Sequence, residues 1–121
     1  MALPKYEASF RRVYGKYKSR AKHKGIAFDL DKPTFRNLCE QDCVYCGAIP
    51  TPPSPIEHAK FNGIWNCNGL DRIDNTRGYV SGNVQPCCTL CNQLKSNLKE
   101  KDFLEHIQSI VSFKTGSIKE D

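Results

Sequence analysis

The strongest structural signal in the chain comes from residues 70–92, which read LDRIDNTRGYVSGNVQPCCTLCN. The pattern predicts a strand over Leu70–Asp74 and a turn over residues 75–78. After a loop at residues 81–83 it predicts a second strand over Val84–Cys87, and then a helix over Thr89–Leu98. The order strand, loop, strand, helix is therefore the expected centre of the fold.

One Cys-x-x-Cys pair, Cys88 and Cys91, lies at the end of this stretch, and a second pair, Cys43 and Cys46, precedes it. The two-residue gap lets both thiolates of a pair point at one ion, and two pairs complete the tetrahedral shell that zinc takes with sulfur. Gly47 permits the tight turn after the first pair. Four protein ligands leave no open position, so the sequence predicts a structural zinc.

Other interpretations of the cysteines remain open. The chain has seven of them, an odd number that argues against a complete set of disulfides. A single Cys-x-x-Cys pair could be a redox pair, and buried cysteines can simply be small core residues. Cys39, Cys67 and Cys87 are left over. Cys87 could replace Cys88 as a ligand, although the two-residue spacing favours Cys88.

A second metal site is suggested by Asp71 and Asn92. The expected topology places the end of the first strand beside the first turn of the helix, so these two side chains could approach each other. A carboxylate and an amide oxygen are hard ligands that suit Mg²⁺ or Mn²⁺ better than zinc. The alternative is that Asp71 and Asp74 cap a turn or pair with Arg72 and Arg77.

The net charge of +5 is unevenly distributed. Residues 1–36 carry ten Lys or Arg against three acidic residues, whereas the rest of the chain is slightly acidic. A helix is predicted here, beginning at Pro4 and ending near Gly25. Its apolar stripe consists of Tyr6, Phe10, Val13, Tyr14, Tyr17 and Ala21. The local positive patch favours contact with phosphates over the alternative, a solvated helix face.

The flanking segments complete an α+β fold. Residues 26–30 alternate as a short extended segment, and Asp31 is typical of the N-cap of a helix. The buried side of that helix is predicted to carry Phe35, Leu38 and Cys39. A proline-rich surface loop then continues to about Asn66. A short last helix, capped by Asp102, is expected to bury Phe103, Ile107, Ile110 and Val111.

Composition limits the class of protein. The 121 residues are 39% hydrophobic and 26% charged, with a mean hydropathy of −0.56. These values suit one globular domain, too apolar for disorder and too polar for a membrane protein. No run approaches the roughly 20 apolar residues that span a bilayer, and residues 1–24 lack the apolar core of a secretory signal. The sequence therefore predicts a cytoplasmic protein.

Taken together, the motifs resemble those of the HNH, or ββα-metal (His-Me finger), nucleases. The resemblance rests on Asp71-Arg72-Ile73-Asp74-Asn75, Gly78-Tyr79, Gly82-Asn83-Val84 and Cys88-x2-Cys91-Asn92, framed by Cys43-x2-Cys46-Gly47. It covers Cys43 to about Leu98 and is nearest to small phage-type members with a four-cysteine zinc, such as phage endonuclease VII. It implies that Asp71 and Asn92 hold a catalytic Mg²⁺ or Mn²⁺, and that Asn83 orients the general base or braces the loop.

One position departs from the pattern of that family. The residue after the metal-binding acid is usually the histidine base, and here it is Arg72. A guanidinium stays protonated and cannot take a proton from water, although it can hold a phosphate. Asp74 could be the base instead, His58 or His23 could fold in from elsewhere, or metal-bound water could ionise without a protein base.

We therefore expect a metal-dependent endonuclease acting on nucleic acid, with DNA favoured. The alternatives are a catalytically impaired, zinc-dependent nucleic-acid-binding or adaptor protein on the same fold, and a protein-interaction module. The expected organisation is a basic helical segment at 1–42, a zinc-bound core with a closing helix at 43–113 and a tail at 114–121. The catalytic candidates are Asp71, Arg72, Asp74, Asn83 and Asn92. The expected phosphate contacts are Arg11, Arg12, Lys16, Lys18, Arg20, Arg72, Arg77 and Lys95. The sequence displays no dimer surface.

Overall fold

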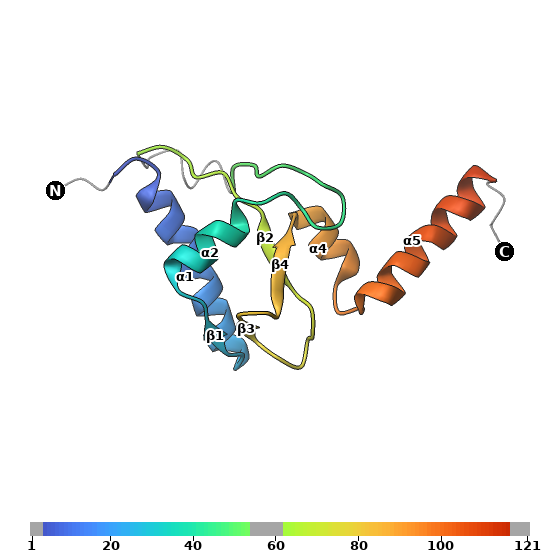
Figure 1. Cartoon of the computed structure of the whole chain (residues 1–121), viewed down its shortest axis with the longest axis horizontal. Coiled ribbons are helices and arrows are strands. Elements are labelled where there is room, and N and C mark those ends of the chain that lie inside the picture. The colour runs from blue at the N-terminus through green and yellow to red at the C-terminus, as the bar shows by residue number, and fades with distance from the viewer. Residues whose placement is uncertain (1–3, 54–61, 117–121) are drawn as a thin grey trace.

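The computed structural model describes residues 4–53 and 62–116, and Figure 1 shows the order of their helices and strands. The elements are α1 (Glu7–Lys24), β1 (Phe28–Asp29), α2 (Lys32–Cys39), β2 (Gly69–Arg72), β3 (Tyr79–Val80), β4 (Val84–Cys87), α4 (Thr89–Lys95) and α5 (Glu100–Thr115). This mixture of helices with two small sheets confirms the predicted α+β class. No helix in these ranges has the length and apolar character needed to cross a membrane.

The centre of the fold is the predicted strand, strand and helix. β2 and β4 pair antiparallel, with Gly69 opposite Cys87 and Arg72 opposite Val84, and α4 follows directly. The first strand ends at Arg72, two residues before the predicted end. The helix α4 ends at Lys95, because the next residue, Ser96, has a left-handed φ of 51° that does not continue a helix.

A second ladder, between β1 and β3, was not predicted. It is parallel and only two residues long, with Phe28 opposite Tyr79. Gly78 allows the approach, since a Cβ on this residue would collide with the backbone of Ala27. The ladder attaches the segment after α1 to the loop that connects β2 with β4.

The core joins α1 and α2 to the central unit through aromatic rings. The Phe10 ring packs edge-on against Trp65 and Phe35, at centroid distances of 5.0 and 6.2 Å. The buried cluster consists of Phe10, Val13, Leu30, Phe35, Cys39, Trp65, Cys67, Leu70 and Val84. Two of the leftover cysteines, Cys39 and Cys67, are therefore core residues. The predicted N-cap is also confirmed, because the Thr34 N–H donates to Asp31 Oδ1 at 2.9 Å.

The last helix differs from the prediction. It begins at Glu100, and the N-cap residue is Lys99 rather than Asp102. Phe103 is buried against the Tyr45 ring, at 5.4 Å between centroids. Ile107 is half-buried, but the prediction that Ile110 and Val111 are buried is wrong, because both are exposed. The reason is geometric: α5 points away from the other elements, so its apolar stripe meets the body only in its first turns (Figure 1).

Candidate functional site

Four cysteine sulfurs meet at one point between the segment after α2 and the start of α4. The Sγ atoms of Cys43, Cys46, Cys88 and Cys91 all lie within 4.8 Å of one another. A tetrahedral zinc with Zn–S bonds of about 2.3 Å needs sulfur atoms about 3.8 Å apart. The Sγ atoms of Cys46 and Cys88 lie 3.7 Å apart. Four convergent thiols at this spacing suit a zinc ion in both geometry and chemistry.

Backbone hydrogen bonds shape this cluster. Gly47 has a φ of 77° and closes the first turn by donating its N–H to Cys43 O at 2.9 Å. The Cys88 sulfur is the N-cap of α4 and accepts from the Cys91 N–H. Burial opposes the Cys43 thiolate, yet hydrogen bonds from the backbone of Cys46, Cys88 and Tyr45 lower its pKa to about 6. Cys87 packs beside the cluster but is not one of its four members.

Asp71 is buried and accepts three hydrogen bonds. Its side chain accepts hydrogen bonds from the Tyr45 hydroxyl at 2.7 Å, from Gln85 Nε2 at 3.2 Å and from Lys95 Nζ at 3.1 Å. Burial and the bond to Asp71 raise the pKa of Tyr45, so this hydroxyl keeps its proton and donates. Because Tyr45 lies between Cys43 and Cys46 in the sequence, the cysteine cluster and Asp71 are directly connected.

Lys95 does not lie where the sequence suggested. Its side chain is 1% exposed and pairs with Asp71, whose side chain is 4% exposed. The prediction that Lys95 contacts a phosphate is therefore wrong for this structure. A lysine in an amphipathic helix is normally solvated, and only the buried carboxylate on β2 explains its position.

Asn92 and Asp71 line the same polar cavity, of about 250 Å³, beside β2 and α4. The Asn92 side chain donates to Leu70 O at 3.2 Å. Arg20, Lys24 and Arg72 bring positive charge to this cavity. A carboxylate and an amide oxygen are a donor set that suits Mg²⁺ or Mn²⁺, and the Lys95 ammonium competes for the same carboxylate.

Arg72, at the position where the HNH pattern has its histidine base, is held by hydrogen bonds to the turn that follows β2. Arg72 Nη1 donates to Asn75 O at 3.1 Å and to Arg77 O at 2.9 Å, and the guanidinium lies 5.6 Å from the Tyr79 ring centroid. Arg72 also lines a second hollow of about 480 Å³, together with Arg77. Arg72 therefore lines two cavities, and some of its N–H groups already donate hydrogen bonds to the turn.

The remaining candidates brace the loop after β2. Asn83 is buried, donates to Asp74 O and Gly78 O, and accepts from the Asp74 N–H. The exposed Asp74 carboxylate accepts from the side chain and N–H of Thr76, and these bonds lower its pKa. It does not line the polar cavity. Asp74 is therefore a poor general base, because it caps a turn outside the site.

No histidine is found among the described residues that line the polar cavity. His23 lies on α1 outside this lining, and His58 lies outside the described residues. The structure thus provides no evident replacement for the missing histidine base at this cavity.

The basic residues of α1 are divided between two faces. Lys16 and Arg20 face the hollows beside β2, and so does Lys24, which the sequence analysis missed. Its spacing of four residues from Arg20 is the signal that could have identified it. Arg11 pairs instead with Glu7 at 3.0 Å. Lys18 lies 5.8 Å from the Tyr14 ring centroid and lines a different hollow, so the phosphate contact predicted for it would lie outside the polar cavity.

Comparisons with known proteins agree with this geometry at the level of the fold. No family model matches the chain. Among solved structures, the rare-cutting HNH restriction endonuclease PacI is similar, with a TM-score of 0.58, 22% sequence identity, and coverage of 90% of this chain and 82% of the other. This likeness confirms the predicted HNH-like fold. The uncharacterized protein R423 of Acanthamoeba polyphaga mimivirus is 33% identical over 100 residues, 83% of this chain, but the chain spans only 16% of that protein's length.

Proposed function

We propose that the protein is a metal-dependent endonuclease that hydrolyses phosphodiester bonds of nucleic acid, with DNA as the first substrate to test. The observation that carries this proposal is the polar cavity, which is lined by Asp71 and Asn92 together with Arg20, Lys24 and Arg72. Hard oxygen donors beside three cations suit a phosphate and the divalent ion that accompanies it. The fold of an HNH restriction endonuclease supports the same conclusion. A specific likeness to phage endonuclease VII stays a prediction from the motifs.

The side chains would divide the work by charge. The substrate phosphate would be held by Arg20, by Lys24 and by those N–H groups of Arg72 that do not bond to the carbonyl groups of the turn. Asp71 and Asn92 would hold Mg²⁺ or Mn²⁺, which stabilises negative charge at a phosphate. Because Arg72 cannot accept a proton, we expect hydrolysis to be slow and to accelerate as the pH rises and hydroxide becomes available.

A second candidate function is binding of nucleic acid without hydrolysis. It is favoured by the hydrogen bonding of Asp71, which already accepts three hydrogen bonds, one of them from the Lys95 ammonium. If Lys95 holds this carboxylate permanently, the basic cavity remains but the divalent ion has no site. The two candidates differ only in whether the ion displaces the lysine.

Cleavage assays with supercoiled plasmid, single-stranded DNA and structured RNA test the proposal, with Mg²⁺, with Mn²⁺ and without added metal. Asn92→Ala is expected to reduce metal-dependent cutting by about 10- to 100-fold, because it removes a ligand without disturbing the buried ion pair. Asn66→Ala is the control, since Asn66 is exposed and lines a hollow elsewhere. Binding that persists with no cutting by any variant would support the second candidate and contradict the first.

A charge-reversal comparison tests the binding face. The double variant Arg20→Glu/Lys24→Glu is expected to weaken binding and to flatten the slope of log K against log salt concentration by about 1.5 to 2, since two phosphate contacts disappear. The control Lys18→Glu/Lys22→Glu changes the net charge equally, but its residues line another hollow. Fluorescence anisotropy titrations at several salt concentrations measure both slopes. Equal slopes for the two variants would remove the cavity from the interface.

A further inference from the structure

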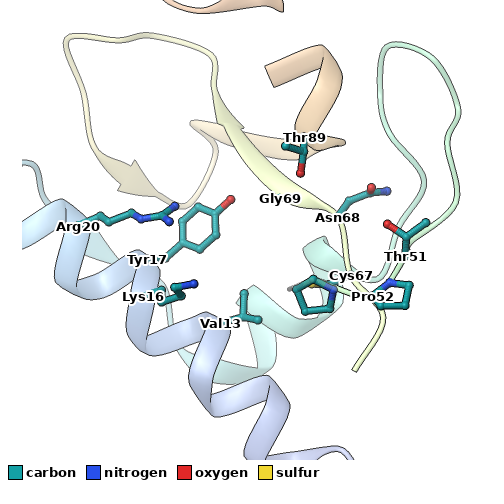
Figure 2. A pocket seen from close by; sticks show the side chains of 11 residues that line it. Val13, Lys16, Tyr17, Arg20, Thr51, Pro52, Cys67, Asn68, Gly69 and Thr89 are labelled. Atoms are coloured by element: carbon teal, nitrogen blue, oxygen red, sulfur yellow. The ribbon is translucent and has the colours of Figure 1, made fainter. Parts of the chain in front are cut away.

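Another cavity, of about 350 Å³, opens beside the polar one, between α1 and residues 51–53 (Figure 2). The two cavities share Tyr17 and Arg20. In Figure 2, Tyr17, Lys16 and Arg20 lie on α1 on one side, and Thr51 and Pro52 lie on the other. A strand of nucleic acid with a phosphate in the polar cavity would therefore place its next nucleotide at this opening.

The walls of this cavity are of two kinds. Val13, Pro52 and the Tyr17 ring form an apolar slot, and the Tyr17 hydroxyl is fixed by the Leu70 N–H at 3.1 Å. Thr51 and Thr89 add hydroxyl groups. Its volume falls within the range of cavities that hold small organic ligands. A flat, partly polar molecule suits such a slot better than a bare ion does.

Asn68 gives the cavity a fixed hydrogen-bonding group. The residue is 5% exposed, and its Nδ2 donates to Gln41 O at 2.9 Å and to Ala48 O at 3.0 Å. These two bonds determine the orientation of the amide. No described residue donates a hydrogen bond to its Oδ1. In the described part of the chain every buried side-chain nitrogen or oxygen has a hydrogen-bond partner, so this Oδ1 is not buried. Asn68 lines the cavity, and this oxygen is the amide atom that its own hydrogen bonds leave for an N–H group of a ligand.

Positive charge lies at the mouth of the cavity. Lys16 and Arg20 are one helical turn apart on α1 and both line it. An apolar and aromatic slot, an oriented acceptor and a cationic mouth are the features by which proteins bind an unstacked base together with its phosphate. Every nucleobase presents an N–H group at its pairing edge, which matches the Asn68 acceptor.

We propose that this cavity holds one unpaired nucleobase of the strand whose phosphate lies in the polar cavity, so that the protein selects single-stranded or locally unpaired nucleic acid. This inference rests on the proposed function in one respect: the base belongs to the nucleic-acid strand that the polar cavity would bind. A base stacked within a duplex cannot enter the slot without first being extruded, and extrusion is easiest where the base has no partner.

The test compares binding to three labelled DNA duplexes in buffer without added divalent metal, so that cleavage plays no part. One duplex is fully matched, one carries a single-adenine bulge, and one carries an abasic site in place of that adenine. The wild-type protein is expected to bind the adenine bulge about tenfold more tightly than either of the others. Because the abasic duplex can bend like the bulge but offers no base, this comparison requires no change to the protein.

A pair of variants tests whether the preference for the adenine bulge arises in this cavity. Thr51→Trp fills the mouth from an exposed position and is expected to abolish the tenfold preference, whereas Ser19→Trp, exposed beside a different hollow, is expected to retain it. Thermal unfolding checks that both variants are folded. Equal affinities for the three duplexes, or a preference that survives in folded Thr51→Trp, would overturn the inference while leaving metal-dependent cleavage intact. A preference without any cleavage would support the inference and contradict the endonuclease, and no binding to any duplex would overturn both.

Discussion

Exchange of Cys91 for serine is expected to leave the protein without bound zinc and largely unfolded at 25 °C. The four sulfurs connect the segment at residues 43–46 to α4. Among the residues that the structure describes, the hydrophobic cluster around them contains only Cys43, Cys87 and Cys91 as buried members. Structural zinc contributes about 10–16 kcal/mol of binding free energy in small zinc domains, which is similar to the roughly 5–15 kcal/mol that separates a folded domain from its unfolded chain. Little would therefore hold this region together without the ion.

Metal analysis of the purified protein and thermal unfolding followed by circular dichroism measure this effect. The matched control is Cys67→Ala, because Cys67 is also buried but belongs to the aromatic core and not to the four-sulfur cluster. That variant should keep one zinc per chain and lose about 1–3 kcal/mol of unfolding free energy, from the cavity it creates. A Cys91→Ser protein that melts like the wild type would show that the four thiols hold no structural ion.

Replacing Lys95 with methionine is expected to reduce the free energy of unfolding by about 3–5 kcal/mol. The substitution leaves the Asp71 carboxylate buried and without its cation, a state that costs far more than the loss of a surface ion pair. Adding Asp71→Asn to Lys95→Met should recover part of this loss, since the second substitution removes the buried charge and keeps an oxygen that can accept from Tyr45.

Urea denaturation of the single and double variants gives the two differences in free energy. Lys99→Met serves as the control, because Lys99 is exposed just before α5, and its loss should change stability by no more than about 0.5 kcal/mol. If Lys95→Met were as mild as the control, the ammonium would be solvated rather than buried. The original interpretation of Lys95 as a phosphate contact would then be restored.

The features that were predictable from the sequence are those with local causes. The Asp31 cap and the β2–β4–α4 order depend on residues close together in the chain, and both are confirmed. The stripe on α1 is confirmed in part: Phe10, Val13 and Ala21 are buried, but Tyr6 is exposed and precedes the helix, which begins at Glu7 rather than at Pro4. The cysteine pairs were also recognisable, because their two-residue spacing is itself the signal.

The features that were missed depend on contacts between distant residues. In the sequence Lys95 looks like any solvated lysine, and only its contact with Asp71 in the structure explains why it is buried. Tyr45 and Asn68 become informative only through partners 26 and 20 to 27 residues away, respectively. The exposure of Ile110 follows from the direction in which α5 leaves the body, which no periodicity encodes.

The hydrogen bond from Tyr45 to Asp71 affects how inhibition by chelators should be interpreted. Tyr45 lies between Cys43 and Cys46 in the sequence, so a reagent that removes an ion from the four sulfurs would also disturb one of the three hydrogen bonds that hold the Asp71 carboxylate. Inactivation by a chelator would then occur whether or not a hard divalent ion takes part in the reaction. The two causes can be distinguished by adding magnesium alone while the zinc content is measured. Recovery of cleavage at an unchanged zinc content would show that a catalytic ion had been lost and that the zinc-bound structure had remained intact.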